Sequence, residues 1–137
     1  MNYIPLGIHE LDTVFKVIDA NPDVQVVILE GDLASGKTTL VNEYARYKGC
    51  RDEVSSPTFS IQNCYCENIF HYDIYNHGLD HFLSLGMLEE LEKEGIHFVE
   101  WGDDALVSLL KNVGLETMVI KIDKNRENKH CYEVIGA

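Results

Sequence analysis

One segment of the chain has residue types and a spacing that suit phosphate chemistry. It consists of Gly31, Asp32, Leu33, Ala34, Ser35, Gly36, Lys37, Thr38 and Thr39, a full match to Gly-x-x-x-x-Gly-Lys-[Ser/Thr]. The two glycines permit backbone conformations that let successive amide groups point into one concave surface. Lys37 can reach the β- and γ-phosphates of a nucleotide, the Thr38 hydroxyl can bind Mg²⁺, and Thr39 can contact the α-phosphate. The pattern therefore predicts a phosphate-binding loop.

Two carboxylates follow apolar segments and are candidates to act on such a nucleotide. Asp73 follows Asn-Ile-Phe-His-Tyr, and Glu100 follows Ile-His-Phe-Val. An acid at the carboxyl end of a strand lies at the edge where open α/β sheets bind ligands. One acid can hold Mg²⁺ while the other orients or activates the attacking water, and the spacing does not assign these two roles. For either acid alone, a surface carboxylate at a strand end is the simpler alternative.

Several residues near the acids are given weaker roles. A single histidine is more often structural, so no catalytic role is assigned to His71, His77 or His97. Trp101, the only tryptophan, directly follows Glu100. The sequence favours a position in the core and a role in a site or interface about equally. The segment 55–59, Ser-Ser-Pro-Thr-Phe, is expected to be a turn before a strand.

The charge balance excludes unaided nucleic-acid binding. The 137 residues contain 11 Lys and Arg against 23 Asp and Glu, a formal net charge of −12. So acidic a chain repels phosphate backbones unless a concentrated basic patch offsets the charge, and no basic run occurs. Residues 80–104 carry eight acids and one Lys. This run indicates a solvated face or, less often, an acidic surface for a partner.

The cysteines and the lengths of the apolar runs indicate the cellular compartment of the protein. The cysteines, Cys50, Cys64, Cys66 and Cys131, have no Cys-x-x-Cys spacing, so reduced thiols are expected. A zinc site that includes Cys64, Cys66 and His71 is a less favoured alternative. No run reaches the ~20 apolar residues of a membrane span, and the first residues lack the pattern of a secretory signal. The sequence therefore indicates a cytoplasmic protein.

The pattern of apolar residues predicts the elements that position these side chains. Helices are expected over 8–20, 38–48, 79–94 and 103–113, and strands over 24–30, 60–66, 69–75, 96–99, 117–123 and 131–135. The phosphate motif then lies between a strand and a helix, as its chemistry requires. The length fits one domain, and strands mixed with helices indicate the α/β class.

Taken together, the motifs resemble those of the TsaE family, small bacterial ATPases of tRNA threonylcarbamoyladenosine biosynthesis. Gly-Asp-Leu-x-x-Gly-Lys-Thr-Thr is followed in order by Ser-Pro-Thr-Phe, His-x-Asp-x-Tyr and Val-Glu-Trp. The resemblance covers roughly residues 5–115 and implies a single P-loop ATPase domain over residues 1–137. Its fold would be a mixed parallel and antiparallel sheet with helices on both faces.

The resemblance also implies a site and partners. The loop residues would bind ATP, with Ser56 and Thr58 in a switch-like segment near the γ-phosphate. Asp73 would be the Mg²⁺-associated acid, and Glu100 and Trp101 an essential pair. The family acts with a TsaB–TsaD assembly, so tRNA would be met only through that complex. ATP in place of GTP follows from the resemblance alone.

Two positions depart from the family pattern. Ala34 occupies a position that is usually glycine, which restricts the loop backbone, and Asn76 replaces a usual arginine. Neither change removes a residue needed to coordinate Mg²⁺.

The arginines favour slow hydrolysis by the isolated chain. An arginine finger can contribute ~10³–10⁵ in rate, and the only arginines are Arg46, Arg51 and Arg126. Arg46 and Arg51 lie at or after the end of the helix expected over 38–48, away from the phosphates. Two alternatives stay open: a stand-alone small-molecule or nucleoside kinase, and a nucleotide-sensing interaction module.

Overall fold

The computed structural model describes residues 2–6, 12–31, 37–50, 62–66, 68–74, 78–84, 86–102, 104–124 and 130–136. The elements in chain order are β1 (Asn2–Leu6), α1 (Asp12–Asp19), β2 (Val26–Glu30), α2 (Lys37–Tyr47), β3 (Gln62–Tyr65), β4 (Ile69–Asp73), α3 (Gly78–Ser84), α4 (Met87–Leu91), β5 (Ile96–Glu100), α5 (Asp104–Asn112), β6 (Thr117–Lys124) and β7 (His130–Gly136). Within these residues no helix is both long and apolar enough to cross a membrane.

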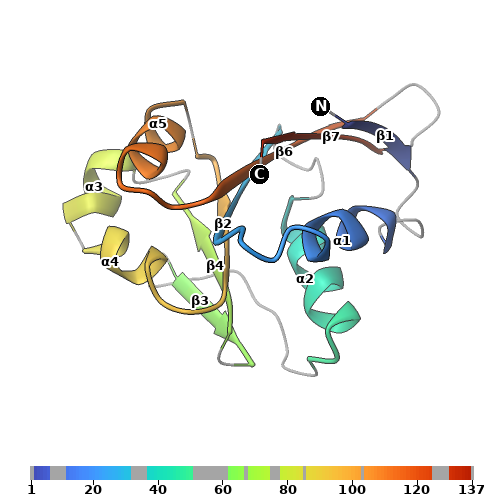
Figure 1. The fold of residues 1–137 in the computed structure, drawn as a ribbon, viewed down its shortest axis with the longest axis horizontal. Coiled ribbons are helices and arrows are strands. Elements are labelled where there is room, and N and C mark those ends of the chain that lie inside the picture. Colours follow the sequence, from blue (N-terminus) through green and yellow to red (C-terminus); the bar gives the residue numbers. More distant parts are fainter. Residues whose placement is uncertain are drawn as a thin grey trace.

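The strands form one mixed sheet in the order β1-β7-β6-β2-β5-β4-β3 (Figure 1). The central strands β6, β2, β5 and β4 are parallel, whereas β3 pairs with β4, and β7 with β6 and β1, in antiparallel fashion. This sheet confirms the α/β class and the mixed parallel and antiparallel sheet that the family resemblance implies. Strand β1 was not predicted. It lies at the edge of the sheet, where the missing N–H of Pro5 is tolerated.

Helices cover both faces of the sheet (Figure 1). Side chains alternate along β2, so Val27 and Leu29 pack with α1 and α2, and Val26 and Ile28 pack with α3, α4 and α5. All four are fully buried, as expected for an apolar strand in the middle of a parallel sheet. Each face of β2 therefore belongs to its own hydrophobic cluster, and the strand is held from both sides.

The helix predicted over 79–94 is wrong as a single element. The structure has two short helices, α3 and α4, and Gly86 precedes the second with a left-handed φ of 74°. The Gly86 amide donates a 3.0 Å hydrogen bond to the Leu83 carbonyl. Glycine adopts this conformation without a side-chain clash, so the chain turns at this position although the apolar pattern continues across it.

The expectation of reduced thiols is wrong for Cys50 and Cys66. These residues form a disulfide with their Cα atoms 5.9 Å apart, a usual separation. Cys50 follows α2 and Cys66 follows β3, so their proximity comes from the fold and not from their spacing of 16 residues. Cys64 is a free and exposed thiol, and the Cys131 side chain lies outside the described residues. Within the described residues, no group of three or more His, Cys, Asp or Glu could hold a metal ion.

His97 has the structural role that the sequence predicts for it. It is fully buried in β5, and its Nε2 lies 2.8 Å from the Lys93 carbonyl oxygen. A carbonyl can only accept, so Nε2 donates, and Nδ1 accepts from the Tyr72 hydroxyl at 2.8 Å. Burial lowers the pKa of His97, partly offset by the Lys93 carbonyl. The ring therefore stays neutral and holds β5 to its neighbours.

This lowered pKa predicts a pH dependence of stability. Below the ordinary pKa of 6.5, the unfolded chain binds a proton at His97 that the folded chain does not. The free energy of unfolding should therefore fall as the pH is lowered through this value. A His97→Gln variant, which can keep both hydrogen bonds, should lose that part of the fall. Urea unfolding of both proteins at about pH 7.5 and about pH 5.5 measures the difference, and an equal fall in both would contradict the assignment.

Candidate functional site at the carboxyl edge of the sheet

The carboxyl ends of three parallel strands bring the predicted residues to one edge. Strand β5 lies between β2 and β4, and Glu100 is paired in register with Leu29 on one side and Asp73 on the other. Strand β2 ends one residue before Gly31, and α2 begins at Lys37. The structure therefore gathers Lys37, Asp73, Glu100 and the start of the phosphate motif, which the sequence places up to 69 residues apart.

Some predicted site residues lie outside the described part of the chain. These are Asp32, Leu33, Ala34, Ser35, Gly36, Ser56 and Thr58. Thr38 is described only as part of α2, without its side chain, and the half-buried Thr39 follows it in the first turn. The structure confirms the strand expected before the motif, which is β2, and the helix expected after it, which is α2.

Lys37 has a buried ammonium group at the start of α2. The residue is 4% exposed, and its Nζ donates a 2.6 Å hydrogen bond to the Gly31 carbonyl. The same Nζ lies 4.1 Å from the centroid of the Trp101 ring. A buried cation needs such compensation, and a carbonyl and an aromatic face both supply negative potential. The ammonium thus lies between Gly31, the first residue of the motif, and Trp101, the residue that follows β5.

Trp101 has an unusual backbone conformation directly after β5. Its φ is 67°, in the left-handed region, which costs of order 1 kcal/mol for a residue with a side chain. Its amide donates to the Leu29 carbonyl at 3.4 Å, and its half-buried ring packs against the cluster under α3, α4 and α5. The tryptophan therefore belongs both to the core and to the site, the two roles that the sequence leaves equally weighted.

Glu100 contacts His71, for which the sequence predicts no catalytic role. The Glu100 Oε2 atom and the His71 Nε2 atom form a short buried contact, and the two residues are 4% and 0% exposed. His71 lies on β4 two residues before Asp73, so both side chains are on the same face of the sheet as Glu100. Its other nitrogen, Nδ1, is buried and has no hydrogen-bond partner among the described residues. The one available signal was this spacing of two within a predicted strand.

The carboxylates at this edge lie on two faces. Asp73 is half-buried on the face of Glu100, and the two supply the oxygen donors that Mg²⁺ prefers. Glu30, which no motif indicated, ends β2 on the opposite face, 4.0 Å from the Lys121 ammonium. Burial raises the pKa of Glu30, with Lys121 opposing and Asp104 adding to the rise. Asp73 and Glu100 are therefore the acids that share a face with α2.

The contact between Lys37 and Trp101 predicts an energetic coupling. A desolvated cation–π pair is worth about 1–2 kcal/mol. A double-mutant cycle of Lys37→Met and Trp101→Leu, read as free energies of unfolding, should give a coupling of that size. The matched cycle of Lys111→Met with Trp101→Leu uses an exposed lysine on α5 and should give less than ~0.5 kcal/mol. Equal couplings in the two cycles would show that the cation over the ring adds nothing.

Comparisons with known proteins agree with the motifs. Residues 9–132 match the profile of the family described as threonylcarbamoyl adenosine biosynthesis protein TsaE. The tRNA threonylcarbamoyladenosine biosynthesis protein TsaE of Treponema pallidum is 32% identical over 105 residues, which cover 74% of this chain and 78% of that protein. Its namesake in Bacillus subtilis is 38% identical over 79 residues, 56% of this chain and 49% of the relative.

A solved structure agrees on the fold. The crystal structure of Bacillus subtilis YdiB superposes with a TM-score of 0.65 at 23% identity, covering 98% of this chain and 86% of that one. The likeness extends over nearly the whole chain and concerns the fold. Because the family profile matches most of the sequence, the chain belongs to the TsaE family.

Proposed function

We propose that this chain binds ATP and Mg²⁺ at the carboxyl edge of its sheet and hydrolyses ATP slowly, as a subunit that acts with a TsaB–TsaD assembly in threonylcarbamoyladenosine modification of tRNA. Membership of the TsaE family supplies the pathway. The observation that carries the chemistry is the Lys37 ammonium. It is buried at the start of α2 and lies at the edge where Asp73 and Glu100 are paired.

Phosphate binding follows from the position of Lys37. Its ammonium contacts the neutral Gly31 carbonyl and the Trp101 ring, and a phosphate oxygen can replace the carbonyl with a stronger, charge-assisted bond. The amino-terminal end of α2 adds positive potential to the same place. Trp101 would remain beside the ammonium and limit the access of water to it. We therefore assign the loop 31–39 and Trp101 to the nucleotide.

The acids and Thr38 fit a magnesium ion by their donor chemistry. A carboxylate at Asp73, one at Glu100 and the Thr38 hydroxyl are all hard oxygen ligands. Bound Mg²⁺ would neutralise charge on the phosphate oxygens. Asp73 is assigned to the ion because the family resemblance implies the Mg²⁺-associated acid at this position, whereas Glu100 contacts His71.

Glu100 is proposed to orient the attacking water, and His71 to position Glu100. Donation from His71 Nε2 to Oε2 restricts rotation of the carboxylate, so the acid does not have to be ordered when the nucleotide binds. His71 is fully buried beneath the site and is a positioning residue, not one that contacts the phosphates.

Slow hydrolysis by the chain alone follows from the cations. Arg46 is the only arginine that the structure describes, and it lies in the last turn of α2 in an exposed pair with Glu43, at the far end from Lys37. No described arginine is therefore placed to stabilise the transferring phosphoryl group, which can be worth ~10³–10⁵ in rate. We propose that the partner assembly raises the rate.

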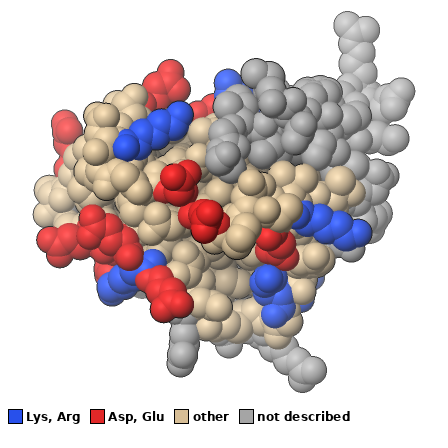
Figure 2. Space-filling model, viewed as in Figure 1, with Lys and Arg blue, Asp and Glu red and all other residues tan. Residues whose placement is uncertain are grey.

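The charge of the chain supports an indirect role toward tRNA. On the face shown in Figure 2, the described Lys and Arg side chains are separated and form no continuous basic area. With a net charge of −12, the chain would be repelled by a tRNA backbone. The partners would therefore hold the tRNA, and we propose that the protein acts in the cytoplasm.

A Glu100→Gln variant tests the proposed function. ATP turnover of the wild-type chain alone should stay below ~10 s⁻¹ and rise when TsaB and TsaD are added. The variant keeps the size of the side chain and should lose at least ~100-fold of the stimulated turnover, with ATP affinity changed by less than about threefold. The matched variant Glu94→Gln, an exposed acid at the other edge of the sheet, should behave as wild type.

Two results would contradict the proposal. Stimulated turnover at the wild-type rate in Glu100→Gln would remove the acid from the chemistry. Phosphorylation of an added hydroxyl acceptor in place of phosphate release would make the chain a kinase.

A further inference from the structure

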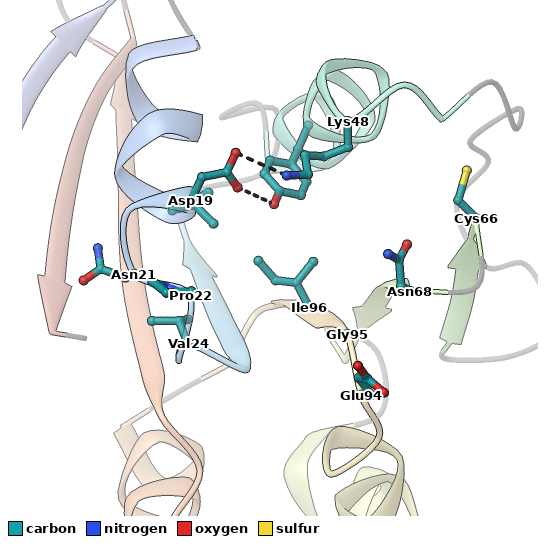
Figure 3. Close-up of a pocket in the computed structure, with 12 residues that line it drawn as sticks. Asp19, Asn21, Pro22, Val24, Lys48, Cys66, Asn68, Glu94, Gly95 and Ile96 are labelled. Carbon is teal, nitrogen blue, oxygen red and sulfur yellow. Dashed lines mark hydrogen bonds and ion pairs between the residues drawn. The ribbon is translucent and has the colours of Figure 1, made fainter.

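A hollow lies at the opposite, amino-terminal edge of the sheet. It is a groove of about 790 Å³ between the ends of α1 and α2 and the beginnings of β2 and β5 (Figure 3). In Figure 3 Cys66 and Asn68 lie at one end of the groove and Asn21, Pro22 and Val24 at the other. A narrower pocket of about 310 Å³ extends along Cys66 to Cys50. The groove shares no residue with the proposed nucleotide site.

The two cysteines of the disulfide at this groove differ in exposure. Cys50 is 6% exposed, whereas Cys66 is exposed and lines the groove. Cys66 also has a left-handed φ of 52°, a conformation that a non-glycine residue keeps only when its surroundings hold it. An external nucleophile can therefore reach the Cys66 sulfur, while the buried Cys50 sulfur is the one that leaves.

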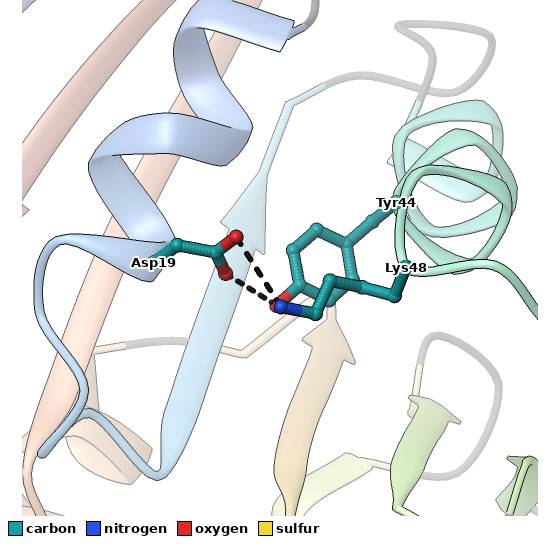
Figure 4. A network of polar contacts seen from close by, with 3 residues as sticks. All are labelled: Asp19, Tyr44 and Lys48. Carbon is teal, nitrogen blue, oxygen red and sulfur yellow. Dashed lines mark hydrogen bonds and ion pairs between the residues drawn. The ribbon is translucent and has the colours of Figure 1, made fainter.

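The charged residues around the groove determine which thiols, by their charge, are favoured as nucleophiles. Asp19 accepts hydrogen bonds from the Tyr44 hydroxyl at 2.9 Å and from the Lys48 ammonium at 3.3 Å (Figure 4). Burial and the bond to Asp19 raise the pKa of Tyr44, so its hydroxyl stays neutral. Lys48 is thus balanced by Asp19, and the carboxylate of Glu94 remains as the net charge among the described residues that line the groove. This lining disfavours an anionic thiol.

We propose that Cys66 is a thiol–disulfide exchange site for a low-molecular-weight thiol of neutral or positive charge. The thiolate attacks the Cys66 sulfur, a new sulfur–sulfur bond forms, and the Cys50 sulfur leaves as a thiolate that takes up a proton. A second thiol of the same class attacks the adduct, which releases the small-molecule disulfide and a Cys66 thiol. Two thiols are oxidised and one protein disulfide is reduced.

Exchange would change a connection between two elements of the nucleotide site. Cys50 follows the helix that begins with Lys37, and Cys66 precedes the strand that ends with Asp73. The bond closes the chain over a separation of 16 residues, so opening it releases a constraint on the unfolded chain. Reducing the disulfide should lower the midpoint of thermal unfolding by roughly 10 °C. This figure combines the stability usually lost when a disulfide-closed loop of this length is opened with the change in midpoint that such a loss causes in a chain of this size.

The experiment compares three thiols of different charge on the oxidised full-length chain. Cysteamine is cationic, 2-mercaptoethanol is neutral and 2-mercaptoethanesulfonate is anionic, and they are compared at equal thiolate concentration because exchange depends on the thiolate. A Cys64→Ser, Cys131→Ser variant leaves one disulfide to react. Acid quenching, alkylation and peptide mass mapping should locate the adduct on Cys66 and the new free thiol on Cys50. Cysteamine should react at least ~threefold faster than the sulfonate, with the difference reduced by salt.

Matched variants test the part played by the groove. Glu94→Gln should raise the rate of the anionic thiol toward that of the neutral one, whereas Asp104→Asn, an exposed acid on α5, should leave it unchanged. If the serine variant does not fold, the same mapping on the wild-type chain gives the site of the adduct.

Three outcomes would overturn the proposal. They are an adduct on Cys50, equal rates for the three thiols, and alkylatable thiols at both Cys50 and Cys66 in the oxidised protein. The experiment contains no nucleotide, so a negative result does not bear on the proposed ATPase activity. A negative result in the ATPase experiment likewise does not bear on the exchange site.

Discussion

The parallel pairing of β5 with β2 on one side and β4 on the other is the constraint on which the site depends. Parallel strands point the same way, so residues that end three separate strands meet at one edge. The register pairs Glu100 with both Leu29 and Asp73, and it places the entry to the phosphate motif beside them. A shift of one residue would turn Glu100 to the opposite face, away from α2. The apolar side chains that bury β2 on both faces hold this register.

The charged groups at this edge are buried, and contacts with neighbouring groups fix their positions. Lys37 is balanced by a carbonyl and an indole ring, and Glu100 by His71. Charges removed from water need partners, and partners of this kind restrict the side chains to few conformations. The described side chains of the proposed site are thus held in place before a ligand binds, which would lower the cost of binding and of reaching the reactive arrangement.

The sequence predicted most elements because their signals are local. The apolar run of β2, the full loop motif and the order of later motifs each occupy a few adjacent residues. The contact of His71 with Glu100 and the bond of Cys50 with Cys66 arise between elements that only the fold brings together, so the sequence does not identify either pair of partners. The helix expected over 79–94 was wrong because one glycine, Gly86, turns the chain where the apolar pattern persists. Strand β1 was missed because Pro5 weakens its pattern.

The two edges of the sheet are proposed to have different chemistry, with phosphate binding at one and thiol exchange at the other. The central claim concerns the first, and it depends on the Lys37 ammonium. Calorimetric titration of ATP and Mg²⁺ into the wild-type chain, Lys37→Ala and the exposed-lysine control Lys111→Ala tests it most directly. Loss of a charge-assisted contact predicts an affinity at least ~10-fold lower in Lys37→Ala, with Lys111→Ala unchanged. Equal ATP affinity in all three proteins would contradict the account.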